Sequence, residues 1–135
     1  MKNIVLPICC LLLNSCTTKF QNDITNNNTE IVLDRINKSS LKKLNSKQGM
    51  GLSLLHTAVI DGKVEIVKAL VNRKVDLDMI SNGLTPLHIA VMDNNTVLVK
   101  ILLEAGADKK IEYKKLNAYD LAEINQNDEI LKLLK

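Results

Sequence analysis

A repeat with a period of 32 residues constrains the fold of this chain more than any other feature of its sequence. Three segments align without a gap: GLSLLHTAVIDGKVEIVKAL at 51–70, GLTPLHIAVMDNNTVLVKIL at 83–102 and KLNAYDLAEINQNDEILKLL at 115–134. Leucine, alanine and lysine recur at fixed places in all three segments. Such a period is typical of stacked units, each of which buries its apolar face against its neighbours.

Each unit contains the pattern of two short helices. Thr85 and Pro86 suit the N-cap and first position of a helix, because the hydroxyl accepts a free backbone N–H and proline has none to leave unpaired. Leu87, Ala90 and Val91 then fall on one face of that helix. A second apolar helix follows and completes the unit.

Both helices end at residues that tolerate a left-handed backbone. Asn94 ends the first helix, where the preceding repeat has Gly62, and Gly106 ends the second. Lys74 occupies the place of Gly106 in the preceding repeat. The alignment therefore predicts a left-handed lysine at this position, which costs free energy that glycine would not.

The segments GLTPLHIA and LVKILLEAGAD resemble the ankyrin repeat, whose signature is T-P-L-H-x-A. The resemblance implies an all-α fold, a short solenoid of helix–turn–helix units with N- and C-terminal capping helices. The register of the N-terminal cap stays open, since matching Glu30 to Glu65 requires an offset of 35 residues. We expect the cap at about 30–46, repeats at about 47–78 and 79–110, and a C-terminal repeat at about 111–135.

The resemblance also implies a structural role for two histidines. In ankyrin repeats the signature histidine bonds to turn backbone and to the N-cap hydroxyl, a role that falls here on His88 with Thr85 and on His56 with Ser53. The alternative is a metal site, because His56, His88 and Asp120 occupy equivalent positions. Packed helices lie about 8–10 Å apart, whereas atoms that share one ion lie at most about 4 Å apart. We therefore expect no metal.

Catalytic motifs are missing from the sequence. The five glycines are scattered and form no phosphate-binding loop, and no serine has the context of a nucleophile elbow. Asp76 and Asp78 could form a carboxylate pair, but they follow a helix where ankyrin repeats have polar turn residues. We expect no enzyme activity, no cofactor and no small-molecule substrate.

The N-terminus differs in character from the repeats. Lys2 precedes the apolar run from Ile4 to Leu13, which as a helix would rise only about 15 Å, half of a bilayer core, so the run is interpreted as a signal peptide. Leu13-Asn14-Ser15-Cys16 resembles the lipobox of bacterial lipoproteins. The resemblance implies a signal peptide at 1–15 and a lipid on Cys16, in the bacterial cell envelope. Thr17 favours the outer membrane.

Residues 16–29 are predicted to be a flexible Asn-rich tether, because Phe20 and Ile24 are too few to offset the entropy of ordering. Removing residues 1–15 leaves 17 basic and 15 acidic residues, and aromatic residues are scarce, so we expect no nucleic acid partner. The lysines at 109, 110, 114 and 115 are interpreted as a solvated face, with acidic lipid headgroups as the alternative contact.

We expect the chain to bind a partner protein. In ankyrin proteins the turn tips and the exposed side of the first helix form a concave binding surface, and apolar residues recur at those places here. They are Leu52, Leu84 and Leu116 before the N-cap, Ile60, Met92 and Ile124 late in the first helix, and Met79, Ile111 and Tyr113 at the turn tips. The leucines could instead pack between repeats or under the N-terminal cap. The alternative function is an accessory or protective subunit that holds an enzyme at the membrane.

Overall fold

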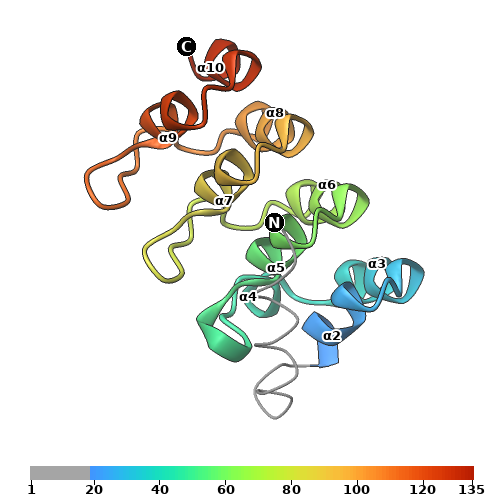
Figure 1. Ribbon diagram of the computed structural model, residues 1–135. Helices are drawn as coiled ribbons and strands as arrows, with labels where there is room; N and C mark the ends of the chain where they lie inside the picture. Colours follow the sequence, from blue (N-terminus) through green and yellow to red (C-terminus); the bar gives the residue numbers. More distant parts are fainter. Residues whose placement is uncertain (1–18) are drawn as a thin grey trace.

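The computed structural model describes residues 19–135 and shows a row of stacked helix pairs (Figure 1). The predicted all-α solenoid is confirmed. Within residues 19–135 there is no strand, and no helix has the length and apolarity needed to cross a bilayer. The helix pairs are α2 (Lys19–Thr25) with α3 (Thr29–Lys38), α5 (Leu54–Ile60) with α6 (Val64–Asn72), α7 (Pro86–Met92) with α8 (Thr96–Ala105), and α9 (Ala118–Ile124) with α10 (Asp128–Leu134).

Like helices pack against like helices along the stack. The first helices α2, α5, α7 and α9 form one row, and the second helices α3, α6, α8 and α10 form another. Their apolar faces meet in one continuous core, with Leu54, Ala58, Ile66, Ala90 and Leu98 fully buried. A short helix, α4 (Leu41–Leu44), and a 3-10 turn, η1 (Gly49–Gly51), lie between the first two pairs.

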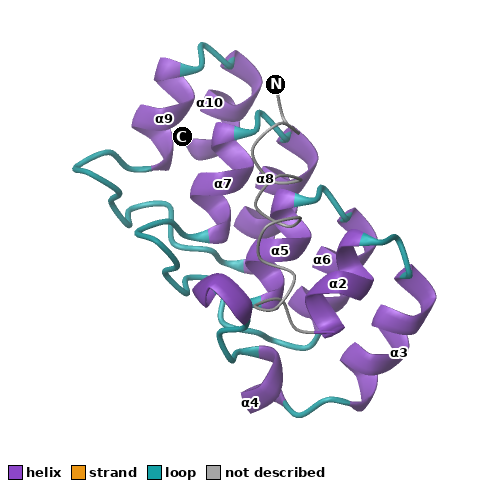
Figure 2. Ribbon diagram, turned by 60° about the horizontal axis from the view of Figure 1, so that its bottom comes forward, coloured by secondary structure: helices purple, strands orange, loops and turns teal. Residues whose placement is uncertain are grey.

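The stack has two different edges (Figure 2). The segments that join one pair to the next, residues 39–53, 73–85 and 106–117, lie along one edge, which we call the loop edge. The short turns inside the pairs, residues 26–28, 61–63, 93–95 and 125–127, lie along the opposite edge, which we call the turn edge. First helices therefore run from the loop edge to the turn edge.

Side-chain caps fix where the first helices begin. The Ser53 hydroxyl accepts a hydrogen bond from the His56 N–H at 3.3 Å, and the Thr85 hydroxyl accepts one from the His88 N–H at 3.3 Å. Asn117 caps α9 in the same place, 32 residues after Thr85. Each cap satisfies a backbone donor that the helix leaves unpaired.

The prediction of a flexible tether at 16–29 is wrong in the part that the structure describes. Lys19–Thr25 is a helix in which Phe20 and Ile24 are buried. Counting apolar residues missed this helix because Phe20 and Ile24, four residues apart, lie on one face and pack on α5. Polar contacts add to the packing: Gln21 Nε2 donates to Thr57 Oγ1 at 3.1 Å.

The predicted N-terminal cap at 30–46 is thus the second half of a complete helix pair followed by α4. Asn27 is left-handed with a φ of 62°, as Gly62 is with a φ of 65°, so the two pairs are offset by 35 residues. This offset matches Glu30 with Glu65, and the three residues beyond the usual 32 lie in the connection that contains α4 and η1.

A partly buried contact from Arg73 ties the first pair to the second. Its guanidinium donates to the carbonyl oxygens of Ile36, of Asn37 at 2.9 Å and of Ser39 at 2.8 Å. These acceptors lie at the end of α3, where carbonyl groups lack helical partners. Arg73 therefore closes α3 from the neighbouring pair.

Candidate protein-binding face

The three first-helix positions that the sequence predicts for partner binding are the last residues of α5, α7 and α9. Ile60 is half-buried, Met92 is 48% exposed and Ile124 is 64% exposed. Because the three helices pack side by side in register, these side chains form one line, which we call the apolar ladder.

Asp61 lies beside the first position of the ladder. Burial raises the pKa of its carboxyl, and the hydrogen bond that Thr25 Oγ1 donates to it at 2.9 Å opposes that effect. This contact comes from α2, so the segment missed by the sequence-based prediction helps to shape the start of the ladder.

The loops that precede α7 and α9 each end in a two-residue hairpin. Ser81 and Leu84 exchange backbone hydrogen bonds of 2.9 and 3.0 Å, and Tyr113 and Leu116 exchange bonds of 2.8 and 2.9 Å. Leu84, Leu116 and the equivalent Leu52 are half-buried, and Leu116 packs against the core. Leu116 therefore contributes to the stack. Contact of the three leucines with a partner stays a prediction.

The turn tips contain an exposed residue that sequence reasoning missed. Met79 and Ile111 are half-buried, whereas Ile80 is 48% exposed. Ile80 precedes the buried Ser81, whose hydroxyl donates to the Gly51 carbonyl at 2.8 Å. Alternation of side chains along a hairpin strand was the signal that could have found it.

Tyr113, predicted to contact a partner, also packs inside the protein. A Cβ added to Gly83 would lie 3.0 Å from its Cδ2 atom, so the ring lies against the preceding hairpin. The ring meets His88 edge-on with centroids 6.5 Å apart, and the Lys114 ammonium lies 5.1 Å from its centroid. Tyr113 thus fills the space between the two hairpins.

His56 links two repeats. Its Nδ1 atom lies 2.7 Å from the Ser53 hydroxyl, and its Nε2 atom lies 3.1 Å from the Leu84 carbonyl oxygen in the next hairpin. A carbonyl only accepts, so Nε2 carries the proton. Burial lowers the pKa of His56, and the Leu84 carbonyl opposes that effect in part. The ring is therefore a neutral, structural group.

His88 contacts the hydroxyl of its N-cap residue as His56 does, but it forms no equivalent hydrogen bond to the next hairpin among the described residues. Thr85 Oγ1 lies 2.8 Å from its Nδ1 atom, which also accepts the Thr85 N–H at 3.2 Å. Its Nε2 atom is buried, and among the described residues none completes a hydrogen bond to it. Burial lowers the pKa of His88, and the nearby Ile111 backbone opposes that effect in part.

The acidic residues considered for metal binding or catalysis are engaged with backbone amides. Asp120 accepts the Asn117 N–H at 2.9 Å as part of a cap. Asp76 accepts the Asp78 N–H at 3.0 Å, and Asp78 accepts the Asp108 N–H at 2.8 Å. No group of three potential metal ligands occurs in the described part of the chain. These carboxylates hold turns together.

The lysines at 109–115 have separate environments. Lys109 Nζ donates to the carbonyls of Leu134 at 2.6 Å and Lys135 at 3.2 Å, so it closes the end of α10. Lys110 and Lys115 are exposed. Only part of the predicted basic patch is therefore free to meet another molecule.

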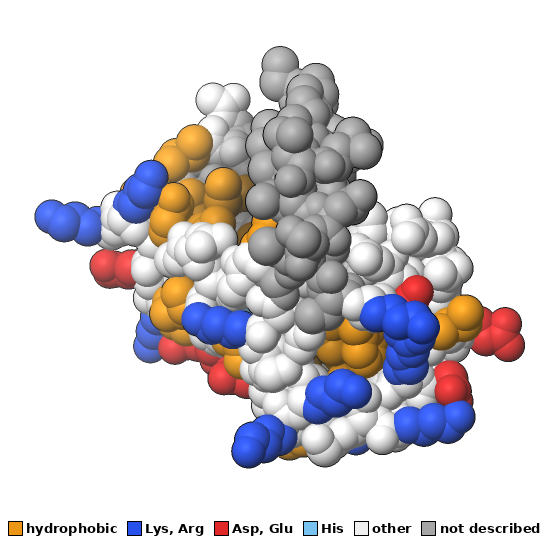
Figure 3. Space-filling view, turned by 90° about the horizontal axis from the view of Figure 1, so that it is seen from below, with side chains coloured by type: hydrophobic (Ala, Val, Ile, Leu, Met, Phe, Trp, Pro, Cys, Tyr) orange, Lys and Arg blue, Asp and Glu red, His pale blue; other side chains and the backbone are white. Residues whose placement is uncertain are grey.

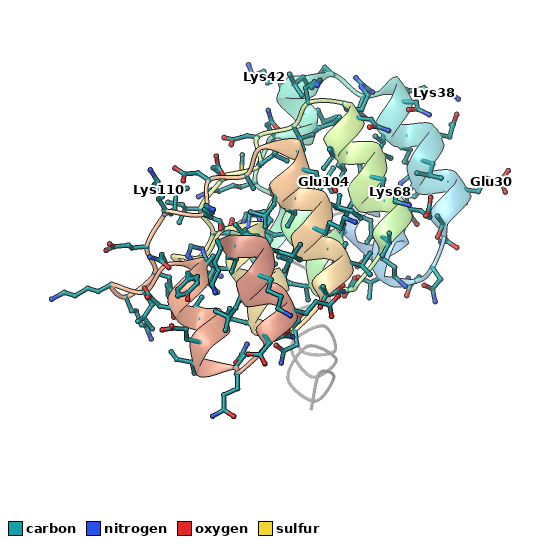
Figure 4. All side chains as sticks on the ribbon, turned by 90° about the horizontal axis from the view of Figure 1, so that it is seen from above. Glu30, Lys38, Lys42, Lys68, Glu104 and Lys110 are labelled. Atoms are coloured by element: carbon teal, nitrogen blue, oxygen red, sulfur yellow. The ribbon has the colours of Figure 1, made fainter. Side chains whose placement is uncertain are left out.

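Figure 3 shows the molecule from below the view of Figure 1. On this side, hydrophobic side chains gather in patches between lysine and arginine side chains. A shallow groove of about 350 Å³ lies elsewhere, between α6 and α8. Lys68 and Glu104 border this groove on the second helices (Figure 4). The apolar ladder and the groove are thus on different helix rows.

Helix pairs that are joined by loops and stacked in a row define a helical repeat protein of the solenoid class. The sequence matches the family described as ankyrin repeats (3 copies), over residues 6–113 and 55–135. The chain belongs to the ankyrin-repeat family. No curated protein was found that matches it. Ankyrin repeats generally mediate protein–protein interaction, and the family is typically non-enzymatic.

Proposed function

We propose that this protein is a membrane-tethered interaction module that binds a partner protein through its concave apolar face. The observation that carries the proposal is the exposure of Met92 and Ile124 at equivalent positions of adjacent helices. Exposed apolar side chains in a line attract a complementary apolar surface, and methionine adapts to its shape. Ile80 adds a further apolar contact at the tip of a hairpin.

The tether in this proposal is a lipid on Cys16, which lies outside the described residues. It rests on the lipobox-like Leu13-Asn14-Ser15-Cys16 and on the apolar run before it. The proposed location is the bacterial cell envelope, at the outer membrane. Cys16→Ser should block processing and move the protein to the soluble fraction. A variant that is processed normally and stays on the membrane would contradict the tether.

The binding face is tested by placing negative charges among its apolar side chains. In the full chain, Met92→Glu with Ile124→Glu should weaken capture of the partner at least about tenfold, because central apolar contacts contribute about 1–2 kcal/mol each. The matched control is Ile31→Glu with Val97→Glu, two residues of similar exposure on second helices. All four side chains are exposed, so both variants should keep cooperative unfolding.

The measurement is crosslinking in the native membrane fraction, followed by identification of what is caught. A photoreactive residue at position 92 or 124 should catch one stoichiometric protein, and the same residue at position 31 or 97 should not. If the Met92→Glu, Ile124→Glu variant captures the same protein as strongly as the control does, the partner site lies elsewhere.

A further inference from the structure

Basic residues gather at one corner of the loop edge. We call Lys38, Lys42, Lys43, Lys47, Arg73 and Lys74 the basic corner. Their two segments lie together, because Arg73 donates to the Ser39 carbonyl at 2.8 Å and the Asp76 N–H donates to Asn45 Oδ1 at 2.8 Å. Segments 38–47 and 73–78 contain these six basic residues and two acidic residues, Asp76 and Asp78.

Most of these charges face solvent. Lys42, Lys43, Lys47 and Lys74 are exposed, and none of them forms an ion pair within residues 19–135. Lys38 pairs with Asp34, and Arg73 is engaged with carbonyl groups. Four lysines are therefore available to an external anion.

The turn edge has the opposite charge. The turns of this edge and the first residues of the second helices that follow them (26–30, 61–65, 93–95 and 125–129) contain one basic residue, Lys63, and six acidic residues: Glu30, Asp61, Glu65, Asp93, Asp128 and Glu129. Figure 4 shows the separation along α3, with Glu30 at one end and Lys38, near Lys42, at the other. An anionic surface would attract the loop edge and repel the turn edge.

The start of α2 lies on the same edge as the basic corner. Gln21 contacts Thr57 and Thr25 contacts Asp61, so α2 runs parallel to α5, with its first residue Lys19 toward the loop edge. Only Thr17 and Thr18 separate Lys19 from Cys16. Three residue steps span at most about 11 Å of extended chain.

We propose that the basic corner lies against the anionic phospholipid headgroups of the membrane that holds the Cys16 lipid. This inference rests on the tether in the proposed function, and it adds an orientation to it. A lipid and a basic patch act together, since each lysine near an anionic surface adds about fivefold to binding. Leu41, an exposed apolar residue between the lysines of the basic corner, reaches the same surface.

The orientation leaves the partner site accessible. The apolar ladder lies at the turn-edge ends of the first helices, one helix length from the loop edge. A membrane against the basic corner therefore covers Leu41 and leaves Met92 and Ile124 pointing to the aqueous side.

The test is lysine labelling of the full lipidated chain bound to vesicles. Labels at Lys42, Lys43 and Lys47 are compared with labels at Lys68, Lys100 and Lys132, which are exposed on second helices. On vesicles that contain phosphatidylglycerol, the first three should be labelled at least about fivefold more slowly than in detergent, and the second three should not change. On phosphatidylcholine vesicles neither set should be protected.

A pair of triple variants provides the matched control. The Cys16→Ser chain should bind phosphatidylglycerol vesicles weakly, and Lys42→Gln with Lys43→Gln and Lys47→Gln should reduce that binding by up to about a hundredfold. Lys68→Gln with Lys100→Gln and Lys132→Gln removes the same charge and should change it little. Raised salt should reproduce the loss, because screening weakens surface attraction.

The outcomes separate the orientation from the tether. Uniform labelling of a chain that stays on the vesicles through Cys16 overturns the orientation and keeps the tether. An unmodified chain that is found to carry no lipid on Cys16 and does not bind phosphatidylglycerol vesicles overturns both. Protection of the basic corner by an acidic protein in the membrane fraction, with none on pure phosphatidylglycerol vesicles, also overturns it.

Discussion

The hairpins at 81–84 and 113–116 have one backbone and two different sets of side chains. Both central residues are left-handed in each hairpin: φ is 53° at Asn82 and 83° at Gly83, and 51° at Lys114 and 67° at Lys115. Asn–Gly is the preferred pair for such a turn, whereas a lysine pair pays the cost of a side chain in this conformation. The stack therefore imposes the same turn on both pairs of residues.

The two histidines that lie next to these hairpins also differ in their hydrogen bonds. His56 bonds to the carbonyl of Leu84 in the hairpin at 81–84, but His88 completes no such bond to the hairpin at 113–116 among the described residues. The second hairpin is held by the ring of Tyr113 against Gly83 instead. Packing has replaced a hydrogen bond.

Acid should lower the stability of the protein through the two buried histidines, and this is the largest effect that we expect. Their pKa values are lowered in the folded state, so below about pH 6.5 the unfolded chain binds more protons than the folded one. The free energy of unfolding should therefore fall as the pH drops below about 6.5, by up to about 2.7 kcal/mol per pH unit for the pair, and be regained above it. Chemical denaturation between pH 5 and 8 measures this.

Replacing the histidines sharpens that result. His56→Gln with His88→Gln should flatten the pH dependence, and a slope as steep as that of the unmodified chain would contradict the assignment. At pH 7.5, His56→Gln should cost about 1 kcal/mol more than His88→Gln. The reason is that His56 Nε2 lies 3.1 Å from the Leu84 carbonyl oxygen, whereas no residue of the described chain completes a hydrogen bond to His88 Nε2.

Gly83→Ala should destabilise the protein by about 2 kcal/mol. The left-handed backbone disfavours a Cβ by about 1 kcal/mol or more, and the new atom would lie 3.0 Å from the Tyr113 ring. In a Tyr113→Ala background the cost should fall to about 1 kcal/mol, since only the backbone term is left. An equal cost in both backgrounds, measured by urea denaturation, would show that the ring does not pack on Gly83.

Giving the second hairpin the residues of the first should stabilise the protein. Lys114→Asn with Lys115→Gly should raise the free energy of unfolding by about 1 kcal/mol, because it removes two left-handed lysines. Lys110→Asn, in the same loop and without a left-handed backbone, is the control and should change little. Loss of stability in the first variant would mean that the lysine side chains make favourable contacts.

Lysine and glycine can also be exchanged at the left-handed positions that end the second helices. Lys74 has a φ of 59° where the next repeat has Gly106 with a φ of 101°. Lys74→Gly should stabilise by up to about 1 kcal/mol, and Gly106→Lys should destabilise by a similar amount. Unchanged midpoints of denaturation in both variants would show that these turns tolerate a side chain without cost.

Features set by neighbours in sequence could be predicted from the sequence. The left-handed Lys74 and the caps at Ser53 and Thr85 depend on residues a few positions away, and the period of 32 aligns them. The helix Lys19–Thr25 could not be found this way. Its stability comes from contact with α5, more than thirty residues later.

The candidate binding face could be predicted only in part, because some of its residues are placed by contacts between distant segments. Met92 and Ile124 are exposed as the helical period indicates, because nothing else in the described chain packs on them. Tyr113 is half-buried because the spacing between hairpins lets its ring reach Gly83, and no local pattern encodes that distance. The cross-repeat link from His56 was implied by the family resemblance alone.

Within residues 19–135, contacts run chiefly from each helix pair to the next. A pulling force applied between the two ends of the stack therefore passes through each interface between helix pairs in turn. Each interface bears the whole load, and the weakest one sets the force at which the protein yields. Extension should then proceed in steps of one helix pair, so the molecule behaves mechanically as a short spring.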